Sequence, residues 1–198
     1  MSTKFNLRIE HGVLTFRNFA GAKKMFNEEG KRNFCVYLDG YDRKGNPFEN
    51  PEFIPRYKYG PDWMDPNTLI EALQRDGWNV KFSKPSDDGE YPARPYIKVN
   101  VKYNPDYPQF NPDVFMVKSD GTTVPVGEDT IHMVDTTWIN NADLIIKPNN
   151  YEERKGIENG RVSADLKTLY ITPVEDDLED EFDGKYARVR REEEELPF

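Results

Sequence analysis

Short stretches of alternating apolar and polar residues run through most of the chain and predict short β-strands. Residues 13–19 alternate in this way, with Leu14 and Phe16 expected on the buried face. The opposite face of that strand then carries Thr15, Arg17 and Phe19. Further strands are expected at 32–38, 78–82, 96–103, 114–117, 130–134, 142–147 and 161–172. The chain is therefore predicted to be mainly β.

One short helix is predicted between these strands. Asp65 can cap its first turn, Pro66 suits its first position, Leu69 begins an apolar face, and Gly77 marks its end. Residues 40–64, which precede it, are rich in prolines and aromatic rings. Since proline interrupts regular elements, this stretch is expected to be an irregular insertion.

Charge divides the chain into two parts. Its 198 residues are 36% hydrophobic, which is enough for one core, and the net charge is −9. Residues 175–198 contain 11 acidic and 4 basic residues, so residues 1–174 carry a net charge of only −2. We expect one domain over 1–174 and a disordered acidic tail over 175–198. The nearly neutral domain can still carry a positive stripe on one face.

Several kinds of chemistry have no support in the sequence. Cys35 is the only cysteine, and His11 and His132 are too far apart in sequence to suggest zinc-ligand spacing. No phosphate-binding glycine loop or serine-nucleophile motif occurs. No apolar run reaches the roughly 20 residues of a membrane helix, and no secretory signal is visible. We therefore expect a cytoplasmic, non-enzymatic protein without a cofactor, a metal ion or a membrane partner.

Aromatic rings and cations recur together on the predicted strands and loops. Single-stranded DNA is bound by this combination, because bases stack on rings while Lys and Arg follow the phosphates. Each ring could instead belong to the core, and the stretch 56–59 could either cover a bound strand or fix its loop to the domain. The candidate DNA-binding residues are Arg17, Phe19, Lys23, Lys24, Tyr37, Arg56, Tyr57, Lys58, Tyr59, Tyr96, Lys98 and Lys102.

Five stretches in order resemble a family of single-stranded DNA-binding proteins of tailed bacteriophages. They are FRNF at 16–19, GKRNFCV at 30–36, DGWNVK at 76–81, ADLIIKPN at 142–149 and LKTLYI at 166–171. The resemblance implies a five-stranded oligonucleotide-binding (OB) Greek-key barrel, here with one short helix and extra hairpins. It also implies that the protein coats single strands during phage DNA replication, recombination and repair in the host cytoplasm, at the nucleoid or at replication sites. Residues 40–64 depart from the family pattern.

The end of the sequence resembles the tails of bacterial single-stranded DNA-binding proteins. The resemblance implies that this segment recruits proteins such as a polymerase, helicase or recombinase, and it could also compete with DNA for the domain. An adaptor that binds only proteins is the alternative function, a metal-dependent nuclease using the tail acids is a weaker one, and self-association stays open. The candidate partner-binding residues are Glu192, Glu193, Glu194, Glu195, Leu196, Pro197 and Phe198.

Overall fold

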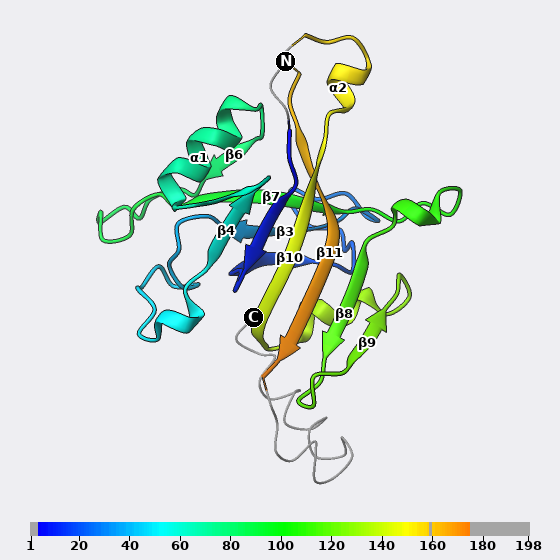
Figure 1. Cartoon of the computed structure of the whole chain (residues 1–198), viewed down its shortest axis with the longest axis horizontal. Helices are drawn as coiled ribbons and strands as arrows, with labels where there is room; N and C mark the ends of the chain where they lie inside the picture. Colours follow the sequence, from blue (N-terminus) through cyan, green and yellow to red (C-terminus); the bar gives the residue numbers. More distant parts are fainter. Residues whose placement is uncertain (1–3, 159, 175–198) are drawn as a thin grey trace.

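The structure of the chain is a computed structural model that describes residues 4–158 and 160–174. Strands dominate it, and the eleven strands of the described residues belong to one strongly curved sheet (Figure 1). The predicted mainly β architecture is confirmed. Within the described residues, no helix is long and apolar enough to span a bilayer.

The fold is organised around one segment that is bent in the middle. Its first half, β1 (Leu7–Glu10), pairs with β10 (Ile139–Asn149). Its second half, β2 (Leu14–Asn18), pairs with β3 (Arg32–Tyr37). One continuous piece of chain therefore joins two parts of the sheet.

The bend itself lies at residues 11–13. His11 takes a left-handed conformation with φ of 56°, which turns the chain between the two halves. The Gly12 N–H donates to the Ala142 carbonyl at 2.8 Å, and the Tyr37 N–H donates to the Val13 carbonyl at 3.1 Å. A Cβ on Gly12 would lie 2.9 Å from Leu144 Cδ2, so a side chain there would force this contact apart. Glycine thus lets Leu144 approach closely where the segment changes partner.

The remaining pairings close the barrel. β3 pairs antiparallel with β7 (Pro95–Val101), β7 pairs parallel with β11 (Ser163–Pro173), and β11 pairs antiparallel with β10. Because β10 pairs in turn with β1, the order returns to the bent segment. This is the five-stranded arrangement of an OB barrel, which confirms the predicted fold.

Additional strands extend the barrel into an eleven-stranded sheet. The hairpin of β4 (Arg56–Tyr59) and β5 (Asp62–Met64) lies beside β1. The hairpin of β8 (Asp113–Val117) and β9 (Thr123–Val126) lies beside β11. β6 (Val80–Phe82) pairs with the first half of β7. Residues 40–64 were predicted to be wholly irregular, and this is wrong for β4 and β5, because pairing with β1 orders them.

The predicted helix is confirmed as α1 (Pro66–Arg75). The Asp65 side chain caps it by accepting the Thr68 N–H, and Gly77 follows its end with φ of 88°. Leu69 and Leu73 are its fully buried leucines. A second helix, α2 (Tyr151–Arg154), has only one turn.

Three short 3₁₀ helices complete the described chain, and one of them corrects a prediction. The strand expected at 130–134 is instead η3 (Ile131–Thr136). Ile131 and Val134 are fully buried and lie three residues apart, a spacing that places both on one side of a helical turn. The other two are η1 (Pro51–Phe53) and η2 (Pro108–Phe110).

In the first predicted strand, the buried and exposed positions also differ in part from the prediction. Phe16 was expected to be buried but is 65% exposed, whereas Phe19 is fully buried. The register between β2 and β3 shifts between Thr15 and Asn18, and Phe16 has φ of 48°. Such a bulge moves the residues that follow it to the opposite face. Phe19 therefore stacks on Phe34 in the core, with ring centroids 4.9 Å apart.

Candidate nucleic-acid interface

Aromatic rings and cations meet on the outer surface of β3 and β7. Tyr37 lies opposite Tyr96, and Cys35 lies opposite Lys98. From β6, Lys81 pairs with Tyr96. These side chains share one face because they are in register on neighbouring strands. We call this surface the β3–β7 face.

The bulge in β2 adds a ring to the β3–β7 face. The centroid of Phe16 lies 6.4 Å from that of Tyr96, with the two rings tilted by 55°. Tyr96 is half-buried, and its burial raises its pKa. Phe16 was missed as a binding residue in the sequence because simple alternation places it in the core. The bulge is therefore what brings an exposed aromatic side chain beside Tyr96.

The charge on the β3–β7 face is positive around Cys35. Lys81 and Lys98 are close enough to act on the Cys35 thiol. Within residues 4–158 and 160–174, neither lysine forms a salt bridge. Their ammonium groups are thus available to phosphates, next to rings on which bases can stack.

Cys35 provides a measurable property of this face. Burial raises the pKa of Cys35 to about 11, although the two lysines act to lower it. Because the thiolate is the reactive form, we expect folded protein to react slowly with iodoacetamide at pH 8 and faster toward pH 11. Mass spectrometry measures the rate. Protein unfolded in urea is the control, since its thiol has an ordinary pKa of about 8.5; equal rates in the two states would contradict the prediction.

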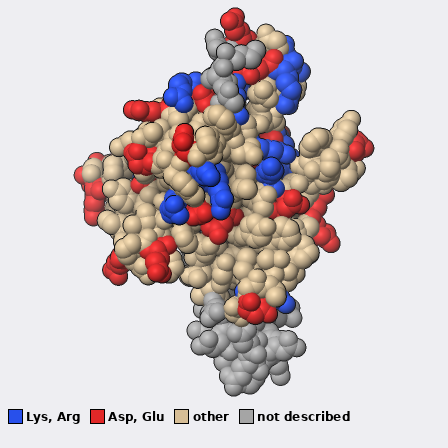
Figure 2. All heavy atoms as spheres, viewed as in Figure 1, with Lys and Arg blue, Asp and Glu red and all other residues tan. Residues whose placement is uncertain are grey.

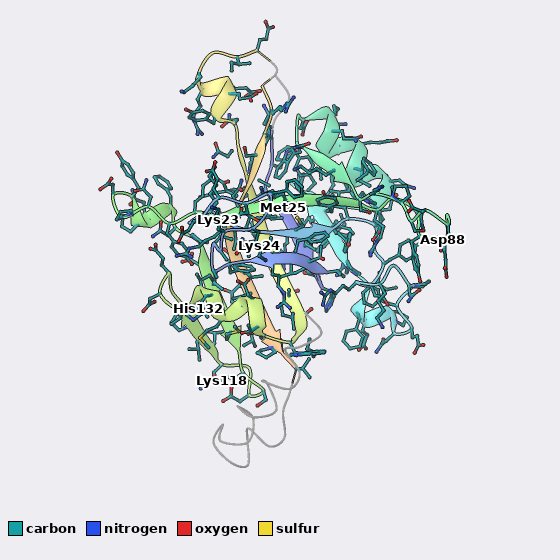
Figure 3. The ribbon with its side chains drawn as sticks, turned by 180° about the vertical axis from the view of Figure 1, so that it is seen from behind. Lys23, Lys24, Met25, Asp88, Lys118 and His132 are labelled. Carbon is teal, nitrogen blue, oxygen red and sulfur yellow. The ribbon has the colours of Figure 1, made fainter. Side chains whose placement is uncertain are left out.

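The loop between β2 and β3 forms one flank of the interface. Lys24 and Asn27 exchange two backbone hydrogen bonds of 3.0 and 3.1 Å, which makes a tight turn. The turn exposes Met25 by 89% and Phe26 by 93%, and Lys23 and Lys24 precede them (Figure 3). The sequence predicted the two lysines but missed Met25 and Phe26. The sequence did contain a signal for a contact surface, because two neighbouring apolar residues in an otherwise polar loop indicate residues that make contacts.

The loop between β10 and β11 forms the other flank. It contains α2, where Tyr151 is 52% exposed and Lys155 Nζ lies 4.7 Å from the centre of its ring. In OB barrels, oligonucleotides bind to the second and third strands and to these two loops. The rings and cations of this chain occupy the corresponding places.

Two further candidates near the β3–β7 face already have partners. Arg94 stacks 3.6 Å from the centre of the Tyr37 ring and pairs with Asp39 at 2.7 Å, so Tyr37 is covered. Lys102 pairs with Asp165 at 3.2 Å but keeps an exposed side chain. Lys102 can therefore reach a phosphate, whereas the Tyr37 ring is covered by Arg94 and does not offer its face to a base.

Three of the predicted stacking rings are core residues, which corrects the prediction. Phe19 is fully buried, and Tyr57 and Tyr59 are each only 2% exposed. The Tyr57 hydroxyl donates to the Tyr37 carbonyl at 3.1 Å, and the Tyr59 hydroxyl donates to Asp76 at 2.6 Å. None of the three offers a ring face to a base.

Arg17 is also engaged within the protein. Its Nη1 donates to the carbonyls of Val134 and Thr137, each at 2.7 Å, and so holds η3 against β2. Burial and the nearby Arg43 lower its pKa, against the effect of Asp135. Arg17 was predicted to bind DNA, but its position is that of a residue that fixes the end of the barrel.

Arg56 and Lys58 lie on a separate part of the molecule. They flank Trp63, with Arg56 Cζ 4.1 Å and Lys58 Nζ 5.6 Å from the ring centre. This cluster belongs to β4 and β5, on the side that faces the viewer in Figure 1. In Figure 2, Lys and Arg gather in the middle of that side with acidic residues among them; Glu10, for example, pairs with Arg56 at 3.3 Å. These residues do not join the β3–β7 face.

The predicted partner-binding residues 192–198 lie outside the described part of the chain, as do the tail acids of the nuclease alternative. Among residues 4–158 and 160–174, no three His, Cys, Asp or Glu side chains gather as metal ligands. The side chains that the described residues offer for binding are therefore aromatic rings and cations on a barrel.

Barrel, face and flanking loops together define an OB-fold protein with a surface suited to single strands. Residues 63–196 match the family described as "Putative phage ssDNA-binding domain", and the chain belongs to this family. No curated protein matches the chain.

Two solved structures are similar to it, each at 10% sequence identity. One is the single-stranded DNA-binding protein from bacteriophage Enc34 with a C-terminal truncation, with a TM-score of 0.43 over 89% of this chain and 94% of that one. The other is the Enc34 protein in complex with ssDNA, with a TM-score of 0.38 over 87% of this chain and 85% of that one.

Proposed function

We propose that this protein binds single-stranded DNA without strong sequence preference and without catalysing a reaction. The proposal is supported by family membership and, above all, by the exposed ring of Phe16 and the half-buried ring of Tyr96 beside Lys81 and Lys98. Every base has a ring face, so stacking tolerates any sequence, and each stacked base contributes about 1–3 kcal/mol. No cofactor is needed for this mechanism.

A bound strand would cross the β3–β7 face between the two flanking loops. Lys81 and Lys98 would follow its phosphates, and Lys23 and Lys24 would hold it at the loop. Phe26, which is almost fully exposed, would then lose its apolar surface to a base or sugar. The proposed role is the protection of exposed strands during phage replication, recombination and repair in the host cytoplasm, with the acidic tail recruiting a polymerase, helicase or recombinase.

Titration of fluorescent oligo-dT at several salt concentrations tests the proposal. Four lysine–phosphate contacts predict a slope of about −3 in a plot of log K against log salt concentration, since each contact to a single strand contributes about −0.7. An affinity that does not change with salt concentration would contradict the lysine contacts, and no binding at low salt would disprove the proposed function. The oligonucleotide should also stay intact when magnesium is added, because cleavage would indicate a nuclease.

A further inference from the structure

A cavity of about 360 Å³ lies where β1 bends into β2. Such a volume is at the small end of ligand sites, which span roughly 300–1,000 Å³. Three rings and two guanidinium groups line much of it: Phe48, Phe53, Trp138, Arg17 and Arg43. None of the binding surfaces described above uses this cavity.

The wall formed by residues 42–48 is held in place from outside. Arg94 donates to the Asp42 carbonyl at 2.8 Å and to the Arg43 carbonyl at 3.1 Å, while it pairs with Asp39. Asp42 also lines the cavity, and its carboxylate accepts the backbone N–H groups of Lys44 and Asn46 at 2.9 and 2.8 Å. These bonds offset its charge and make the wall a fixed part of the domain.

The lining brings two positive charges together, Arg17 from β2 and Arg43 from the wall of residues 42–48. Arg17 is anchored on the η3 carbonyls, and Arg43 is near enough to lower its pKa. Asp135 offsets part of this repulsion, but its two oxygens also accept the N–H groups of Phe19 and Ala20 at 2.7 and 2.9 Å. A site with two neighbouring cations and an aromatic floor favours an acidic ligand with an apolar end.

The described chain leaves the domain beside this cavity. The Val174 N–H donates to the carbonyl of Trp138, a lining residue, at 2.9 Å. The 24 residues that follow carry a net charge of −7 and include four glutamates before Leu196, Pro197 and Phe198. Fully extended, they span roughly 80 Å, so their length does not limit access. A short linker also gives an effective concentration of about 1 mM, at which weak contacts suffice.

We propose that this cavity binds residues 192–198 of the same chain. Leu196 and Phe198 contact the rings of Phe48, Phe53 and Trp138, and the glutamates lie near Arg17 and Arg43. The site is separate from the β3–β7 face, so the proposal does not depend on DNA binding. Its consequence is that a partner protein must compete with this cavity for the tail.

Fluorine NMR of the full chain labelled with 5-fluorotryptophan tests the proposal. The chain has three tryptophans, and Trp138→Phe identifies the resonance of Trp138. Phe198→Ala should shift that resonance and leave those of Trp63 and Trp78 in place. Arg43→Glu should shift it too, and adding Phe198→Ala to Arg43→Glu should then have little further effect. Lys155→Glu, in the loop at the far end of β10 from Trp138, is the matched control and should change nothing.

Three results would overturn the proposal. The Trp138 resonance could be unchanged by Phe198→Ala, which would show that the tail does not occupy the cavity. Its shift could depend on protein concentration, which would assign the cavity to the tail of a second copy. Oligo-dT could move the resonance in the Phe198→Ala chain, which would assign the cavity to a nucleobase. Failure of oligo-dT binding alone affects only the proposed function.

Discussion

The combined change of Tyr96 to Ala and Lys98 to Glu is expected to weaken oligo-dT binding by about 100-fold or more at low salt. Loss of one stacked base costs about 1–3 kcal/mol, and a glutamate adds repulsion where a phosphate contact had been. The two residues lie on β7 beside Phe16, so both changes affect the same bound nucleotides. Fluorescence anisotropy with labelled oligo-dT measures the affinity.

Two variants control this experiment. Tyr96→Phe keeps the ring and should bind within a few-fold of the parent chain, because stacking does not need the hydroxyl. Lys118→Glu makes the same charge change in the turn between β8 and β9, and it should lower affinity only slightly through net charge. If the Lys118 variant lost as much affinity as the double variant, general charge would explain binding and the β3–β7 face would not.

Replacement of Phe19 by Ala is expected to lower the free energy of unfolding by about 3–5 kcal/mol, as is usual for large aromatic side chains in a core. Phe19 is fully buried and stacked on Phe34, so its removal leaves a cavity that the barrel cannot easily close. Urea denaturation followed by tryptophan fluorescence measures the change. A loss of that size is a large fraction of the roughly 5–15 kcal/mol by which a typical domain is stable.

Phe16→Ala is the matched variant, on β2 and three residues before Phe19. Since Phe16 is 65% exposed, its removal should change the unfolding free energy by no more than about 0.5 kcal/mol. The same change should weaken oligo-dT binding, because it removes a ring from the β3–β7 face. The reverse pattern, with Phe19 neutral and Phe16 destabilising, would show that the bulge in β2 is misplaced.

Local signals in the sequence predicted much of the fold correctly. The helix has its cap at Asp65 and its end at Gly77 because both are short-range effects of single residues. β3 and β7 follow the simple alternation of half-buried strands. The strands β1, β4 and β5 were missed, because their stability comes from pairing with one another and with β10, far away in sequence.

The candidate site was only partly predictable for a related reason. Lys98 and Tyr96 were found because β7 is regular, so its faces follow from the sequence. Phe16 and Phe19 were exchanged because a bulge changes the face of a residue and leaves no mark in the pattern of hydrophobicity. Tyr57 and Tyr59 resemble surface rings in sequence, since they alternate with Arg56 and Lys58, yet the strand that carries them turns both rings inward.

The bent segment also sets the order in which the newly made chain can fold. β1 can pair with β4 early, because Leu7 lies opposite Tyr59, but its barrel partner β10 is missing until well over a hundred further residues have left the ribosome. At ordinary rates of synthesis, this wait is on the order of ten seconds. β2 and β3 can form their hairpin long before then, because only a short loop separates them. The barrel therefore stays open until β10 and then β11 have been made, because β10 pairs with β1 and β11 joins β10 to β7.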